Sequence, residues 1–90
     1  MPAISVMKLN ETTFEVTVND LSSTTHTVTV PPDYAVKLTG GRVEAEMLVV
    51  RSFEFLLERE SNTSILHSFE LPVIARYFPE YERVIGTMLE

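Results

Sequence analysis

The sequence predicts an α+β fold in which an N-terminal antiparallel β-hairpin or three-stranded meander is followed by a long central helix and two to three short C-terminal helices. Along the first third of the chain, apolar and polar residues alternate with the two-residue period of a half-buried strand. The stretch from Arg42 to Arg59 lacks glycine and proline and repeats apolar residues every three or four positions, as a helix surface does. The 90 residues are enough for one domain over 1–90, with a β segment over 1–31 and a helical segment over 33–90.

The predicted hairpin consists of two strand-like runs around a polar turn. In the first run, Phe14, Val16 and Val18 share one face. The second run, 25–30, alternates threonine with histidine and valine, and β-branched residues favour strands. The segment 19–23 between them contains Asn and Asp, which tolerate turn conformations. We therefore expect a hairpin closed by a polar loop.

A third strand is expected over Ile4 to Leu9, because a two-stranded hairpin alone is marginally stable in water. The sequence leaves open whether this strand pairs within the chain, through the turn at 10–12, or across a dimer. Pro31 and Pro32 end the sheet, because proline has no N–H to donate to a strand ladder.

Two helices are expected next. Asp33 is a suitable cap for a short helix over 33–38, which the glycine pair Gly40-Gly41 ends. The long helix covers Arg42 to Glu60. Its apolar stripe is wider than one face, so we expect the sheet on one side and helices or a partner on the other.

Three short helical turns are expected in the last third, at 64–69, 72–78 and 79–89. The second and third begin with Pro72 and Pro79, because a proline in the first turn of a helix loses no hydrogen bond. This succession has the general shape of a helix-turn-helix. A DNA-binding helix normally presents a cluster of basic side chains, however, and this segment is largely acidic.

Composition limits the class of protein. There is no cysteine, which excludes a disulfide scaffold and thiolate chemistry. The formal net charge of −6 disfavours phosphate backbones and anionic membrane surfaces as partners. The first residues do not follow the pattern of a signal peptide, and no apolar run is long enough to span a bilayer. We therefore expect a cytoplasmic protein without nucleic-acid or membrane partners.

The sequence contains no recognisable catalytic, metal or nucleotide motif, and we expect no cofactor. His26 and His67 are the only histidines, and they could hold a metal only if the fold joined them to a carboxylate. The simpler interpretation places His26 on a strand surface and His67 on a helix surface. Glu54 and Glu58 are four apart on one helix face, where neighbouring arginines indicate solvated salt bridges rather than paired catalytic carboxylates.

The best candidates for contact with another protein are Tyr77 and Tyr81, together with Arg76. Tyrosine is common at interfaces because it combines apolar area with a polar tip. The two tyrosines are four positions apart, so they predict an exposed strip on one helix face. Phe69 and Phe78, by contrast, are expected to complete the core.

Three classes of function follow from these observations. The first is a non-catalytic interaction or regulatory module, acting as a homodimer that covers its surplus apolar surface. The second is a helix-turn-helix-like or antitoxin-type DNA-associated regulator. The third is a small enzyme that uses His26 or His67, which would require a pocket beside one of them.

A resemblance to a known group of proteins lies in the C-terminal half. The run Ser52 to Glu60, the triplet Ser64-Ile65-Leu66 and the run Tyr77 to Glu82 together resemble a signature of small uncharacterised prokaryotic proteins. This resemblance implies no activity, cofactor or site.

Overall fold

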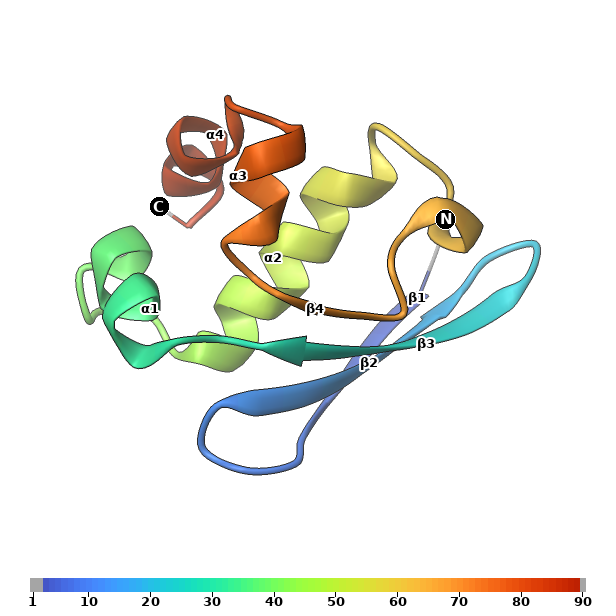
Figure 1. Cartoon of the computed structure of the whole chain (residues 1–90), viewed down its shortest axis with the longest axis horizontal. Coiled ribbons are helices and arrows are strands. Elements are labelled where there is room, and N and C mark those ends of the chain that lie inside the picture. Colours follow the sequence, from blue (N-terminus) through green and yellow to red (C-terminus); the bar gives the residue numbers. More distant parts are fainter. Residues whose placement is uncertain (1–2, 90) are drawn as a thin grey trace.

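The computed structural model describes residues 3–89 and contains a four-stranded sheet with helices gathered on one side of it (Figure 1). The elements, in chain order, are β1 (Ala3–Lys8), β2 (Thr13–Asn19), β3 (Ser23–Thr29), α1 (Pro32–Thr39), α2 (Ala45–Leu57), the 3-10 turn η1 (Asn62–Ser64), β4 (Ser68–Glu70), α3 (Val73–Tyr77) and α4 (Tyr81–Met88). The predicted α+β class, with strands first, is confirmed.

The sheet has the order β1-β2-β3-β4. The first three strands form an antiparallel meander, in which Val6 lies opposite Val16 and Val16 lies opposite His26. The expected third strand therefore pairs within the chain. Phe14, Val16 and Val18 share the buried face, as their alternation predicts.

The fourth strand corrects the sequence-based expectation. The segment 64–69 was predicted to be a helical turn, but it contains only the end of η1 and then enters β4, which runs parallel to β3. The Thr27 N–H donates to the His67 carbonyl at 2.7 Å, and the Leu71 N–H donates to the Thr29 carbonyl at 2.9 Å. This segment pairs with the free edge of β3, because buried backbone N–H and C=O groups require hydrogen-bond partners. The segment 33–90 is consequently not purely helical.

The central helix is also shorter than predicted. It covers Ala45–Leu57 instead of Arg42 to Glu60. At its start, Gly40 and Gly41 both have positive φ, 68° and 76°, so the chain reverses after α1 and uses the next residues to reach α2. At its end, the N–H groups of Arg59 and Glu60 both donate to the Leu56 carbonyl, where the helix unwinds.

The remaining helices lie close to their predicted places. The helix expected over 33–38 is α1, and the two expected after Pro72 and Pro79 are α3 and α4. Each of the latter begins one or two residues later than predicted. Two α-helices therefore follow α2, because the predicted helical turn at 64–69 is not formed.

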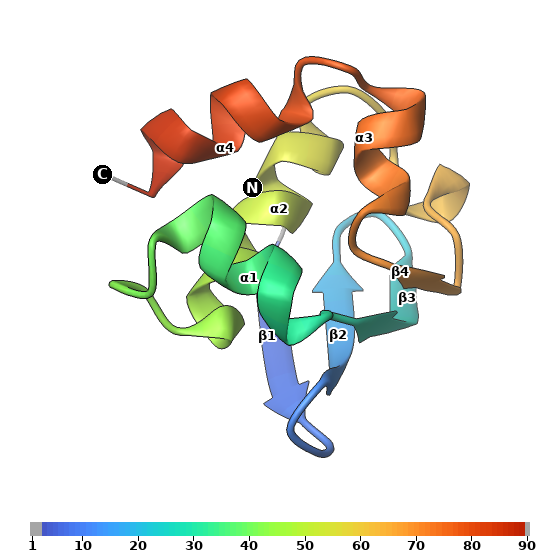
Figure 2. The same cartoon turned by 60° about the vertical axis from the view of Figure 1, so that its left-hand side comes forward.

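The core lies between the sheet and α2, α3 and α4. Helix α4 contacts both α1 and α2, and the helices pack against one another on one side of the sheet (Figure 2). The fully buried aromatic residues are Phe14, Phe53, Phe55 and Tyr81. In the described part of the chain, no helix is both long and apolar enough to cross a membrane.

Candidate functional site

An apolar groove lies between the C-terminal end of α2, the η1–β4 segment and α3. Its volume is about 370 Å³, within the range of pockets that bind small ligands or side chains. The lining residues are Leu56, Glu60, Ser64, Ile65, Leu66, Phe69, Val73, Ile74, Tyr77 and Phe78.

The groove has a buried floor and an exposed apolar rim. Leu56, Ile65 and Ile74 at its floor are almost completely buried. At the rim, Leu66 is 48% exposed and Tyr77 is 68% exposed. Large apolar side chains on a surface lose favourable burial energy, which a partner would restore. The rim is therefore where a partner would gain most by binding.

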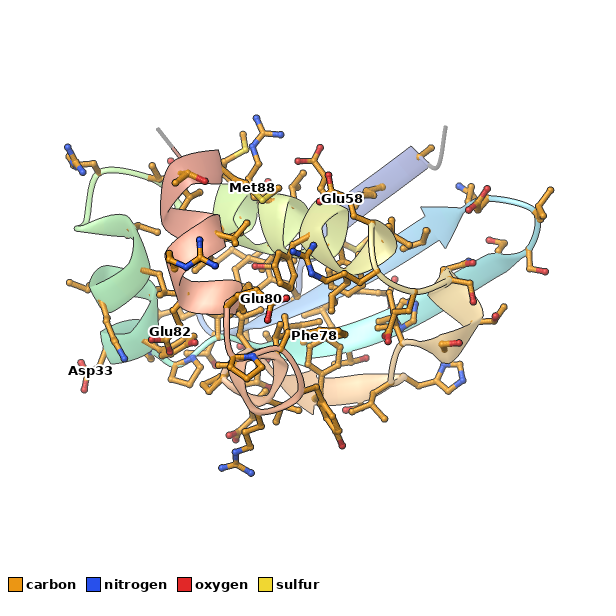
Figure 3. The ribbon with its side chains drawn as sticks, turned by 90° about the horizontal axis from the view of Figure 1, so that it is seen from above. Asp33, Glu58, Phe78, Glu80, Glu82 and Met88 are labelled. Atoms are coloured by element: carbon orange, nitrogen blue, oxygen red, sulfur yellow. The ribbon has the colours of Figure 1, made fainter. Side chains whose placement is uncertain are left out.

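Glu60 is the one charged residue that lines the groove. It is half-buried, and among the described residues it takes part in none of the observed ion pairs. Other acidic residues nearby are already paired: Arg59 contacts Glu58 and Glu80, which Figure 3 labels. The groove therefore offers one carboxylate beside an apolar surface.

Packing beneath the groove holds its walls in place. Phe78, which ends α3, stacks edge-on against Phe55 of α2, with the ring centroids 5.8 Å apart. Its N–H donates to the Ile74 carbonyl at 2.8 Å. On the opposite wall, the Leu66 carbonyl accepts a 2.7 Å hydrogen bond from His26 of β3. Both rim residues are thus carried by segments that are anchored to the core.

The structure separates the two predicted tyrosines. Tyr77 lies on the groove rim, and Arg76 is exposed next to it on α3 without lining the groove. Tyr81, predicted to be exposed, is fully buried, so the expected Tyr77/Tyr81 strip does not exist. The reason is the break at Pro79: α3 and α4 are separate helices, and helical i, i+4 geometry does not hold across it.

Tyr81 instead forms a buried polar contact with α2. Its hydroxyl lies 2.6 Å from Ser52 Oγ, and Ser52 Oγ lies 2.7 Å from the Leu48 carbonyl oxygen. Because a carbonyl can only accept, Ser52 donates to Leu48 and accepts from Tyr81. Burial raises the pKa of Tyr81 well above its ordinary value.

A second polar cluster joins α4 to α1. The Tyr34 hydroxyl donates to Glu82 at 2.8 Å, and Lys37 pairs with the same carboxylate at 3.1 Å; Figure 3 labels Glu82 on α4. The Tyr34 hydrogen bond, followed by the Lys37 ammonium, lowers the pKa of Glu82. Burial, followed by the bond to Glu82, raises the pKa of Tyr34. This cluster ties α4 to α1.

The two histidines are brought together, although not as predicted. His26 is fully buried instead of lying on a strand surface. His67 is exposed, and it precedes β4 instead of lying on a helix. Their rings stack with centroids 5.8 Å apart.

Hydrogen bonds assign His26 a structural role. Its Nδ1 must donate to the Leu66 carbonyl, which can only accept. Its Nε2 lies 2.8 Å from Thr24 Oγ1, and that hydroxyl accepts from Asn62 at 3.0 Å. In the neutral ring, with its proton on Nδ1, Nε2 accepts from the Thr24 hydroxyl, and both ring nitrogens are engaged. Among the described residues, no three His, Asp or Glu side chains are placed to hold a metal ion.

Sequence reasoning predicted that Tyr77 is exposed, as observed, but did not predict the groove around it. The signal that could have indicated the groove is Leu66, which lies next to Ile65 within the otherwise polar stretch 61–68. Comparison with known proteins adds no further assignment: no family model matches the chain, and neither curated proteins nor solved structures give a significant match.

Proposed function

We propose that this chain is a non-catalytic protein-interaction module of the cytoplasm, and that the groove binds an apolar segment of a partner protein. The observation that carries this proposal is the exposed pair Leu66 and Tyr77 above a buried apolar floor. A central apolar pocket with a tyrosine at its rim has the composition of an interaction hot spot.

The partner segment should combine an apolar residue with a nearby lysine or arginine. Glu60 supplies a carboxylate at the groove, and the chain as a whole carries a net charge of −6. A cationic side chain next to the apolar one would therefore be attracted during approach and could pair with Glu60 on binding. The same charge disfavours nucleic acid as the occupant.

The alternative functions have weaker support. A helix-turn-helix-like or antitoxin-type regulator was expected to use three successive helical turns, of which the first is replaced by η1 and β4. An enzyme using His26 would need a free ring nitrogen, whereas both nitrogens of His26 are engaged. Neither histidine lines the groove.

A displayed library of random peptides tests the groove. The wild-type chain is expected to enrich peptides in which an apolar residue lies near Lys or Arg, with dissociation constants of about 1–100 µM. Leu66→Glu and Tyr77→Ala should weaken the binding of those peptides by about tenfold or more. Leu21→Glu is the matched control, because Leu21 is completely exposed at the β2–β3 turn and does not line the groove.

The proposal fails if no peptide is enriched over the Leu66→Glu variant. It also fails if the control weakens binding as much as the groove variants do.

We also propose that the module acts as a homodimer. Apolar side chains remain exposed away from the groove, notably Met7 at 59%, Leu9 at 49% and Met47 at 43%. A small domain with surplus apolar surface commonly covers it with a second copy.

A further inference from the structure

Three aromatic side chains line the groove, and they come from two of its walls. Phe69 belongs to β4, Tyr77 to α3, and Phe78, which Figure 3 labels, ends α3. Phe69 and Phe78 are half-buried, whereas Tyr77 is mostly exposed. Among the described residues, no two of these three rings pack against each other. The groove therefore presents three separate aromatic side chains to a ligand that enters it.

Two of these rings are held in place from behind. Phe69 packs against Phe53 of α2, with the ring centroids 6.1 Å apart, and Phe78 packs against Phe55 at 5.8 Å. Phe53 and Phe55 are fully buried. The positions of Phe69 and Phe78 are consequently fixed before a ligand binds, which reduces the entropy that is lost on binding.

The charge of the groove comes from Glu60, the one charged residue in its wall. The cation nearest to it in the chain, Arg59, is already paired with two other glutamates. Two exposed residues that adjoin the wall in sequence, Glu70 and Arg76, carry opposite charges, so their fields largely offset each other. The groove therefore favours a cation.

The rest of the wall indicates which kind of cation fits. A lysine ammonium carries three N–H donors, and it loses strongly bound water when it is buried. Apart from Glu60, the lining side chains offer it only the hydroxyls of Ser64 and Tyr77. Ser64 Oγ already lies 3.3 Å from Ser61 Oγ. A trimethylammonium group has no N–H donor to satisfy, and its charge interacts favourably with aromatic faces while its methyl groups contact apolar side chains.

The rim indicates that this cation belongs to a protein. Leu66 is 48% exposed and Tyr77 is 68% exposed. A free quaternary ammonium ion inside the groove would leave both side chains largely in water. A lysine side chain enters with its neighbouring residues attached, and these cover the rim and gain the burial energy that it offers.

We infer that the groove recognises a trimethylated lysine in an apolar segment of a partner protein. The trimethylammonium group lies among Phe69, Tyr77 and Phe78. Glu60 is its counter-ion, and the residues that flank the lysine cover Leu66. The inference rests on the proposed function of the groove and names the residue that the groove selects.

A synthetic peptide library provides the test. Its central residue is lysine, trimethyl-lysine or a neutral isostere in which a tert-butyl group replaces the trimethylammonium group, and the flanking positions are random. The wild type is expected to enrich peptides with trimethyl-lysine. In isothermal titration calorimetry, these should bind about five- to tenfold more tightly than the same peptides with either other central residue. The isostere has the same shape without the charge, so it separates recognition of the cation from apolar contact.

Variants of the groove locate the recognition. Tyr77→Leu keeps apolar surface but removes the ring, so the preference for trimethyl-lysine over the isostere should fall to about twofold or less, whereas Tyr77→Phe should retain it. Glu60→Gln should weaken binding of the trimethylated peptide by about fivefold and leave binding of the isostere unchanged. Glu11→Gln is the matched control, because it removes the same charge at an exposed turn outside the groove, and it should change neither.

The outcomes separate this inference from the proposed function. Peptides that bind equally well with lysine or with the isostere overturn the recognition of trimethyl-lysine and leave the groove standing as an apolar binding site. An effect of Glu11→Gln as large as that of Glu60→Gln overturns the role of Glu60. If no peptide binds in this library or in the displayed one, both the inference and the proposed function are wrong.

Discussion

The hydroxyl of Tyr81 donates a 2.6 Å hydrogen bond to Ser52 Oγ in the interior of the protein. Both residues are fully buried, and the contact joins α4 to α2. The Tyr81 ring also packs edge-on against Phe55, with centroids 5.2 Å apart. A single tyrosine thus connects the C-terminal helix to the core by a polar and an apolar contact.

Removing Ser52 Oγ and removing the Tyr81 hydroxyl should lower the stability of the protein by different amounts. Ser52→Ala leaves the buried Tyr81 hydroxyl without its acceptor, and we expect the free energy of unfolding to fall by about 1–3 kcal/mol. Tyr81→Phe leaves Ser52 bonded to Leu48, so the loss should be about 1 kcal/mol. The double variant should lose less than the sum of the two. Urea denaturation of all four proteins provides the measurement, and strictly additive losses would contradict the assignment.

The Glu82 cluster predicts sensitivity to acid. Because the folded-state pKa of Glu82 is lowered, its contribution to stability is present above the ordinary glutamate pKa of about 4.3 and is lost as the pH falls through the folded value. Glu82→Gln should therefore be less stable than the wild type at pH 7, by up to about 1 kcal/mol for this partly exposed group. The difference should shrink towards about pH 2.

Denaturation curves at several pH values measure this difference. Glu11→Gln is the control, because Glu11 is exposed at the β1–β2 turn. A gap between wild type and Glu82→Gln that stays constant from neutral to strongly acidic pH would show that ionisation of Glu82 is not responsible.

The two histidines should differ in their importance for stability. His26→Phe keeps an aromatic ring but leaves the Leu66 carbonyl and the Thr24 hydroxyl without their ring partners, so we expect a loss of about 1–3 kcal/mol. His67→Phe, at an exposed position, should change stability by about 0.5 kcal/mol or less. Thermal denaturation can compare the two, and equal effects would refute the structural role of His26.

Two glycines should respond to alanine in opposite directions. Gly40 has a φ of +68°, where alanine is strained, so Gly40→Ala should destabilise the protein by about 1 kcal/mol. Gly86 lies inside α4, and an added Cβ there meets no atom within 4 Å. Gly86→Ala should therefore stabilise the protein by about 0.5–1 kcal/mol. The midpoints of urea denaturation give both signs, and a stabilised Gly40 variant would be inconsistent with the left-handed cap.

The sequence by itself determined those elements whose pattern is local. The alternation at Phe14, Val16 and Val18 identified both the strand and its buried face. The apolar spacing after Arg42 located the central helix, although not its ends. Such periods are set by the backbone geometry of strands and helices, so neighbouring residues are sufficient to reveal them. Of the two tyrosines predicted to be exposed, only Tyr77 is.

Only the tertiary structure decided the features that depend on distant partners. The segment before Leu71 becomes a strand because its backbone forms hydrogen bonds with the edge of β3. His26 is buried because Leu66 and Thr24 form hydrogen bonds with both of its ring nitrogens. Tyr81 turns inward because Ser52, 29 positions away, accepts a hydrogen bond from its hydroxyl. The groove exists only where α2, β4 and α3 converge. These outcomes arise from hydrogen bonds and packing between segments far apart in the chain, which no local pattern contains.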